Sequence, residues 1–186
     1  MLEDLGRHDL ALQSLARVPS AFDSPDYRFT LAEIGDAARA DALLNADIRK
    51  APTDTLLTQV FAAEQRAAEA LRRGQPQAAI AALEPARPYE MRTFDIPYLR
   101  GEAYLAAHDG ARAAVEFRKI LSNPGIEAVS CHYALSQLGL ARALRLQHDV
   151  AASRAAYEQF FRDWQGADPG MPLLSAARSE YAGLRS

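Results

Sequence analysis

The sequence lacks most of the features that enzymes and membrane proteins need. Its single cysteine, Cys131, excludes an intramolecular disulfide and favours a reducing compartment, so we expect a cytoplasmic protein. The glycines stand singly, which excludes a Gly-rich loop for nucleotide phosphates, and no histidine pair has metal-ligand spacing. We therefore expect no catalytic residues, no metal and no cofactor in this chain.

Charge and hydropathy exclude two further classes of partner. The net charge is −3, which is not the basic surplus of a nucleic-acid-binding domain. No stretch approaches the roughly 18 consecutive apolar residues that a membrane-spanning helix needs. We expect neither nucleic acid nor membrane as a partner of these residues.

What the sequence does contain is typical of a helical globular protein. Hydrophobic residues make up 49% and charged residues 24%, a balance that supports a packed core. About a fifth of the residues are alanine, and arginine far outnumbers lysine. Both alanine and arginine are strong helix formers, so the composition predicts an all-α fold.

The segment Pro97–Leu121 predicts two short antiparallel helices. Gly101 and Tyr104 lie one turn apart on the first helix, and Ala113 and Phe117 lie one turn apart on the second. A small residue allows two helix backbones to approach closely, and an aromatic ring can fill the space beside that contact. We expect Tyr104 and Phe117 to be buried between helices.

Similar helix-turn-helix units recur along the chain. The expected turn residues are Gly6, Gly35, Gly74, His108 and His148, at intervals of 29, 39, 34 and 40 residues. We interpret the two histidines as turn residues rather than catalytic ones, because histidine adopts positive φ more readily than most residues.

The small-then-aromatic pattern at this spacing resembles the tetratricopeptide repeat (TPR), whose period is about 34 residues. The resemblance implies a single TPR-like solenoid over residues 1–186, a right-handed superhelix of antiparallel helix pairs. Its expected parts are a partial repeat (1–21), four repeats (24–52, 53–88, 92–122 and 127–165) and a C-terminal capping helix (171–185).

Three stretches carry a narrower resemblance: Gly101–Ala107, Glu116–Leu121 and Phe161–Trp164 with Ala167–Pro169. They look like the TPR region of bacterial eukaryote-like serine/threonine protein kinases, and related repeats follow winged-helix transcriptional regulators. The resemblance implies a C-terminal module of a larger bacterial signalling protein. Only Met1–Leu5 precede the first predicted turn, so we expect the chain to be a piece of such a protein.

Several local signals predict where helices begin and which residues they bury. We expect helix starts at Ser24-Pro25 and at Thr53 or Asp54, and a long helix from about Glu127 to Gln147. The segment 89–96 is expected to be a linker. Four aromatic residues at helical spacing predict a core rather than a ligand cage: Tyr157, Phe160, Phe161 and Trp164.

The last helix, Pro172–Leu184, is expected to cover the apolar end of the solenoid. Its inward face should comprise Leu173, Leu174, Ala177, Tyr181 and Leu184. Arg178, Glu180 and Arg185 should stay in water.

In the TPR family the first helices of successive repeats line a concave surface. Placing this chain in the same register puts ten residues there: Glu64, Leu71, Arg72, Tyr98, Glu102, Leu105, Leu135, Leu138, Arg142 and Arg145. Aromatic residues and arginine are frequent interface anchors, although an exposed arginine on a helix needs no partner.

This surface predicts a protein- or peptide-binding scaffold and not an enzyme. Arg142 and Arg145, beside Leu138, favour an acidic, partly apolar peptide as the partner. Replacing both arginines by glutamate is expected to leave the melting temperature nearly unchanged. The alternatives are a small-molecule sensor or enzyme site in the groove, or the TPR module of a winged-helix regulator.

Overall fold

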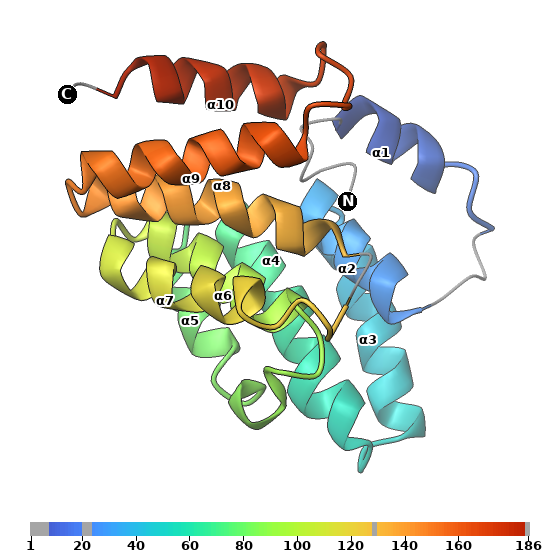
Figure 1. Cartoon of the computed structure of the whole chain (residues 1–186). Coiled ribbons are helices and arrows are strands. Elements are labelled where there is room, and N and C mark those ends of the chain that lie inside the picture. The colour runs from blue at the N-terminus through green and yellow to red at the C-terminus, as the bar shows by residue number, and fades with distance from the viewer. Residues whose placement is uncertain (1–7, 20–23, 128–129, 185–186) are drawn as a thin grey trace.

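The computed structural model describes residues 8–19, 24–127 and 130–184, and within them every regular element is helical (Figure 1). The all-α prediction is confirmed. The expected turn at Gly6 and most of the partial repeat 1–21 lie outside the described residues. The α-helices are α1 (His8–Leu15), α2 (Pro25–Ile34), α3 (Ala37–Lys50), α4 (Ala62–Arg72), α5 (Pro76–Ala82), α6 (Asp95–Ala106), α7 (Gly110–Leu121), α8 (Cys131–Leu146), α9 (Val150–Asp163) and α10 (Pro172–Ala182).

The helices pack with their neighbours in chain order. Consecutive helices form pairs, α2 with α3, α4 with α5, α6 with α7, and α8 with α9. The first helices of these pairs also contact one another, α2 with α4, α4 with α6 and α6 with α8. Figure 1 shows α8, α9 and α10 as successive layers, with α10 outermost.

The four helix pairs share one turn geometry. Among the described residues, Gly35, Gly74, His108 and His148 are those with positive φ, and each ends the first helix of a pair. In every turn the next residue donates its backbone N–H to a carbonyl five residues back, at 2.8–3.1 Å. This is the Schellman arrangement, which satisfies the carbonyls left free at a helix end. The prediction that both histidines are turn residues is confirmed.

An aspartate follows three of these turns and begins the second helix. The side chains of Asp36, Asp109 and Asp149 each accept a backbone N–H from three residues ahead, at 3.0–3.3 Å. Such N-caps satisfy donors that the first turn of a helix leaves unpaired. A helix end and a helix start are therefore encoded in two adjacent residues.

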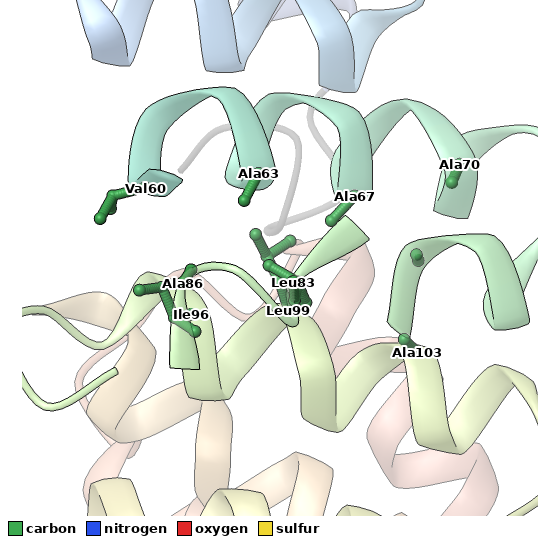
Figure 2. Close-up of a cluster of buried hydrophobic side chains, with 10 residues drawn as sticks. Val60, Ala63, Ala67, Ala70, Leu83, Ala86, Ile96, Leu99 and Ala103 are labelled. Atoms are coloured by element: carbon green, nitrogen blue, oxygen red, sulfur yellow. The ribbon is translucent and has the colours of Figure 1, made fainter. Parts of the chain in front are cut away.

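The core is a series of clusters, each shared by adjacent helices. Figure 2 shows one of them, in which alanines of α4 face Leu83, Ile96 and Leu99. The next cluster joins α6, α7 and α8 around Phe117, and another joins α8, α9 and α10. Each of these clusters combines side chains from several helices that lie close to one another in chain order.

Phe117 is fully buried, and Tyr104 is 6% exposed, as predicted. The Phe117 ring lies between two glycines. A Cβ atom at Gly101 would lie 2.7 Å from this ring, and one at Gly139 would lie 2.5 Å from it. Because both positions are glycine, the backbones of α6 and α8 can both pack closely against the Phe117 ring of α7.

Some predicted helix boundaries differ from the structure. Asp54 caps the predicted helix, as expected, by accepting the backbone N–H of Leu57. The first part of that helix, Leu56–Phe61, is a π-helical segment that leads into α4. α8 begins at Cys131, not near Glu127, because Ser130 caps it and Glu127 instead accepts the N–H of Phe94 at 3.0 Å. The segment 89–96 is more than a linker, since Phe94 and Ile96 are fully buried.

The terminal helix α10 covers the apolar side of α8 and α9, as predicted. Leu174, Ala177 and Leu184 are buried there, and Leu173 and Tyr181 pack beside them. Tyr157 and Phe160 of α9 are fully buried in the same cluster, which confirms the core prediction for these two rings. Phe161 and Trp164 are half-buried and pack against the cluster from its edge. The expectation that Glu180 stays in water is wrong, because it contacts α8 and α9.

Candidate functional site

A groove with a volume of about 400 Å³ runs across the first helices of the pairs. Residues of α2, α4, α6 and α8 form its walls, and α10 closes one side with Leu173. The lining combines apolar and charged side chains: Glu33, Ala68, Leu71, Arg72, Tyr98, Leu99, Glu102, Ala106, Leu135, Leu138, Arg142 and Leu173.

Seven of the ten residues assigned to the concave surface line this groove: Leu71, Arg72, Tyr98, Glu102, Leu135, Leu138 and Arg142. They lie in three different helices that are separated by more than 20 residues in the sequence. The assignment missed Glu33, Ala68, Leu99, Ala106 and Leu173. Glu33 lies in α2, the first helix of the pair before α4, and Leu173 lies at the start of α10. Extending the same register to these two helices would have found both residues.

Three predicted residues lie elsewhere. Glu64 is on the expected helix but is 7% exposed and does not reach the groove. Arg145 is exposed at the end of α8, beyond the groove wall. Leu105 packs beside the cluster of Tyr104 and Ala113 instead.

The apolar floor of the groove belongs to the protein core. Leu138 is 1% exposed and Leu135 is 3% exposed. Leu71 and Leu173 are half-buried, so they can offer apolar surface to a ligand. The floor is therefore part of the core, and the apolar surface that a ligand can contact lies at its edges.

Tyr98 forms an aromatic wall of the groove, and ring contacts hold its side chain in place. Its ring stacks on the imidazole of His132 with a centroid distance of 4.4 Å. It also meets the ring of Phe117 edge-on at 6.1 Å. The side chain of His132 is 13% exposed, and Cys131 beside it is half-buried. These contacts fix the orientation of Tyr98 before any ligand binds.

Arg142 is not the exposed arginine that the sequence suggested. Its Nε and Nη2 atoms donate to the two carboxylate oxygens of Glu180 in α10, both at 2.9 Å. The hydroxyl of Tyr157 donates to the same carboxylate at 2.6 Å. The side chains of Arg142 and Glu180 are 27% and 23% exposed. This carboxylate thus joins α8, α9 and α10 at the edge of the groove.

The hydrogen bonds among Arg142, Tyr157 and Glu180 also change the pKa values of these groups. Burial opposes ionisation of Glu180, but the hydrogen bonds from Arg142 and Tyr157 outweigh it and lower the pKa of the carboxyl group. Burial and the bond to Glu180 raise the pKa of the Tyr157 hydroxyl. The guanidinium of Arg142 is neutralised within the chain, so it cannot hold a ligand carboxylate without competing with Glu180.

Arg142→Glu is now expected to destabilise the protein by about 1–3 kcal/mol, because it leaves two carboxylates facing each other in a half-buried site. The matched control, Arg145→Glu, changes an exposed charge three residues further on and should cost less than about 1 kcal/mol. Urea unfolding of both variants measures the difference. Equal stability of the two variants would contradict this role of Arg142.

Within the described ranges, no three His, Cys, Asp or Glu side chains are placed to hold a metal ion. In the same ranges, no helix has the length and apolar character to cross a bilayer. What the lining offers is a fixed aromatic wall, an apolar floor and a mixed set of charges at the edge.

Comparison with known proteins adds no assignment: no family model, no curated protein and no solved structure matches this chain.

Proposed function

We propose that this chain is a scaffold that binds a segment of another protein in the groove across α2, α4, α6 and α8. The proposal rests on one observation: seven of the ten residues that the TPR register assigned to a concave surface line a single groove of about 400 Å³. Such grooves between helices accept peptides by seating apolar side chains on the floor and pairing polar groups at the edge.

We also propose that the helix pairs form a TPR-like right-handed superhelix. Four Schellman turns at near-repeat spacing and the packing of successive first helices support this architecture. The resemblance to the C-terminal repeats of bacterial serine/threonine kinases supports a place in a larger signalling protein. The same resemblance leaves a winged-helix regulator as the alternative.

The chemistry of the groove favours a peptide with a bulky apolar side chain. That side chain can contact Leu71 and Leu173 above the floor of Leu135 and Leu138. Glu102 and Arg72 can then meet polar groups of the peptide at the edge. An acidic partner remains a proposal that depends on Arg145, because Glu180 neutralises Arg142.

A groove-filling substitution tests the proposal. Ala106 is exposed at the end of α6 and lines the groove, so Ala106→Trp fills space without entering the core. Peptides selected from a displayed random library on the unmodified protein should bind this variant at least about tenfold more weakly, since a lost interface anchor costs about 1–2 kcal/mol or more. The matched control is Ala111→Trp, at an exposed position of α7 away from the groove.

Equal binding of the selected peptides to both tryptophan variants would place the binding surface outside the groove. A small-molecule site is the second candidate, since a volume of about 400 Å³ falls in the range of ligand pockets. A library that yields no peptide binder, together with a small molecule whose affinity falls with Ala106→Trp, would favour this candidate instead.

A further inference from the structure

A second cleft lies at the other end of α2 from the groove. It has a volume of about 370 Å³ and is formed by the start of α2, the end of α3 and the π-helical segment Leu56–Phe61. α2 contributes Pro25 and Arg28 to this cleft and Glu33 to the groove, and no described residue lines both. The cleft is therefore a separate candidate site, of a size that suits a small molecule.

Two cations share one carboxylate on the α2–α3 side of the cleft. Nη1 of Arg28 donates to Oδ2 of Asp47 at 2.8 Å, and Nζ of Lys50 donates to Oδ1 of the same carboxylate at 2.9 Å. The side chain of Arg28 is 3% exposed, whereas that of Lys50 is 75% exposed. Because the Lys50 ammonium has three donors and reaches in from solvent, it can bond to Asp47 and to the carboxylate of a ligand at the same time.

An exposed carboxylate stands on the π-helical side of the same cleft. The backbone N–H of Asp54 donates to the carbonyl of Ala51 at 3.2 Å, and this turn brings Asp54 next to the end of α3. Oδ1 of Asp54 accepts the backbone N–H of Leu57 at 3.0 Å, which fixes the side chain at the cleft. A carboxylate offers about four acceptor positions, so this bond leaves capacity for an ammonium group.

The π-helical segment supplies apolar surface to the cleft. Leu57 is 7% exposed and Phe61 is half-buried, and both line the cleft. The backbone N–H of Ala62 donates to the carbonyl of Leu57, five residues back, as in a π-turn. Such turns are rare and are frequently found at functional sites. The cleft therefore combines a cationic side, an anionic side and an apolar surface.

We propose that this cleft binds a free α-amino acid with an apolar side chain. The ligand carboxylate pairs with Lys50 near the buried charge of Arg28, and the ligand ammonium pairs with Asp54. The ligand side chain contacts Leu57 and Phe61. An internal peptide segment carries neither terminal charge, so it does not match this lining. The site is independent of what the groove binds.

NMR titration of the ¹⁵N-labelled full chain with L-leucine and L-phenylalanine tests the proposal. We expect saturable shifts of the backbone amides at Leu57 and Phe61, with a dissociation constant below about 1 mM. Two analogues of leucine separate the charges, since 4-methylpentanoate lacks the ammonium group and 3-methylbutylamine lacks the carboxylate. Each should bind at least about fivefold more weakly than L-leucine.

Two exposed positions provide variants that keep the fold. Lys50→Ala should weaken L-leucine binding at least about fivefold. Its matched control is Arg49→Ala, which removes an exposed charge at the same end of α3 outside the cleft and should leave binding unchanged. Asp54→Asn keeps an acceptor for the N–H of Leu57 but removes the charge. It should weaken L-leucine and leave 4-methylpentanoate unaffected.

Absence of saturable binding by both amino acids would overturn the proposal. The largest shifts at Leu71 and Tyr98, which line the groove, would also overturn it, as would equal binding by the Lys50→Ala and Arg49→Ala variants. If 4-methylpentanoate binds as tightly as L-leucine, the cleft is a general carboxylate site and the amino-acid assignment is wrong. The comparison of the ligands needs no variant, so the test stands even if a variant does not fold.

Discussion

Phe117→Ala is expected to lower the free energy of unfolding by about 3–5 kcal/mol, the usual cost of removing a fully buried aromatic ring. The ring fills the space between Gly101 of α6 and Gly139 of α8, so its removal leaves a cavity where three helices meet. Urea unfolding measures the loss. A cost below about 1 kcal/mol would mean that the ring is not packed in this way.

A double-mutant cycle sharpens this prediction. Gly101→Ala alone should destabilise, because its Cβ would lie 2.7 Å from the Phe117 ring. The same change in the Phe117→Ala background should be neutral or stabilising, because the methyl group then enters the cavity and favours the helix. Additive effects of the two substitutions would contradict direct contact between the two positions.

Arg100→Met is expected to cost about 3–5 kcal/mol, because it removes one partner of a buried ionic cluster. Arg100 is fully buried, and its Nη2 donates to Glu116 at 3.0 Å and also to Glu90. The Nζ atom of Lys119 bridges the same two carboxylates at 3.0–3.2 Å. The cluster ties the segment before α6 to α6 and α7, and without Arg100 the carboxylate of Glu116, 7% exposed, would lose half of its compensation.

Burial opposes ionisation of Glu90, but hydrogen bonds from Lys119 and Arg100 outweigh it and hold the pKa of its carboxyl group below the ordinary value. The stabilising contribution of Glu90 should therefore be present above its ordinary pKa and be lost as the pH falls through the lower, folded-state value. Arg100→Met should weaken this acid-side dependence.

Two further variants separate the buried cluster from ordinary surface charge. Arg100→Met combined with Glu116→Leu should recover at least half of the loss, because an apolar pair leaves no buried charge without a partner. Arg87→Ala breaks an exposed pair with Glu84 in the same segment and should cost less than about 1 kcal/mol. If the double variant does not regain stability, or if Arg87→Ala costs several kcal/mol, then packing rather than charge determines the stability of this region. Thermal and urea unfolding measure all three.

The parts of the fold that the sequence predicted are those with local signals. Gly35, Gly74, His108 and His148 could be assigned as turn residues because positive φ restricts residue type and an N-cap follows three of them. The all-α class followed from composition, because the abundant alanine and arginine favour helices. The predicted start of α8 near Glu127 was wrong, because the bond of this residue to Phe94, 33 positions away, has no local signal in the sequence.

The candidate site was predictable where helical register decides and not where charges pair. Register brought Leu71, Tyr98 and Leu138 to one groove, since residues a whole number of turns apart share a helix face. Register could not reveal that Glu180 binds Arg142 from 38 residues away, nor that Glu64 is 7% exposed and lies outside the groove. Long-range pairing depends on how the helices pack, which no single segment encodes.

The most direct test of the scaffold proposal is to map a bound peptide by NMR. A peptide selected on the unmodified protein would be titrated into the ¹⁵N-labelled chain, and backbone amide shifts would be followed. The account predicts that the largest changes fall at Leu71, Tyr98, Glu102 and Ala106, which line the groove. Changes confined to the outer face of α7 around the exposed Val115 would contradict it.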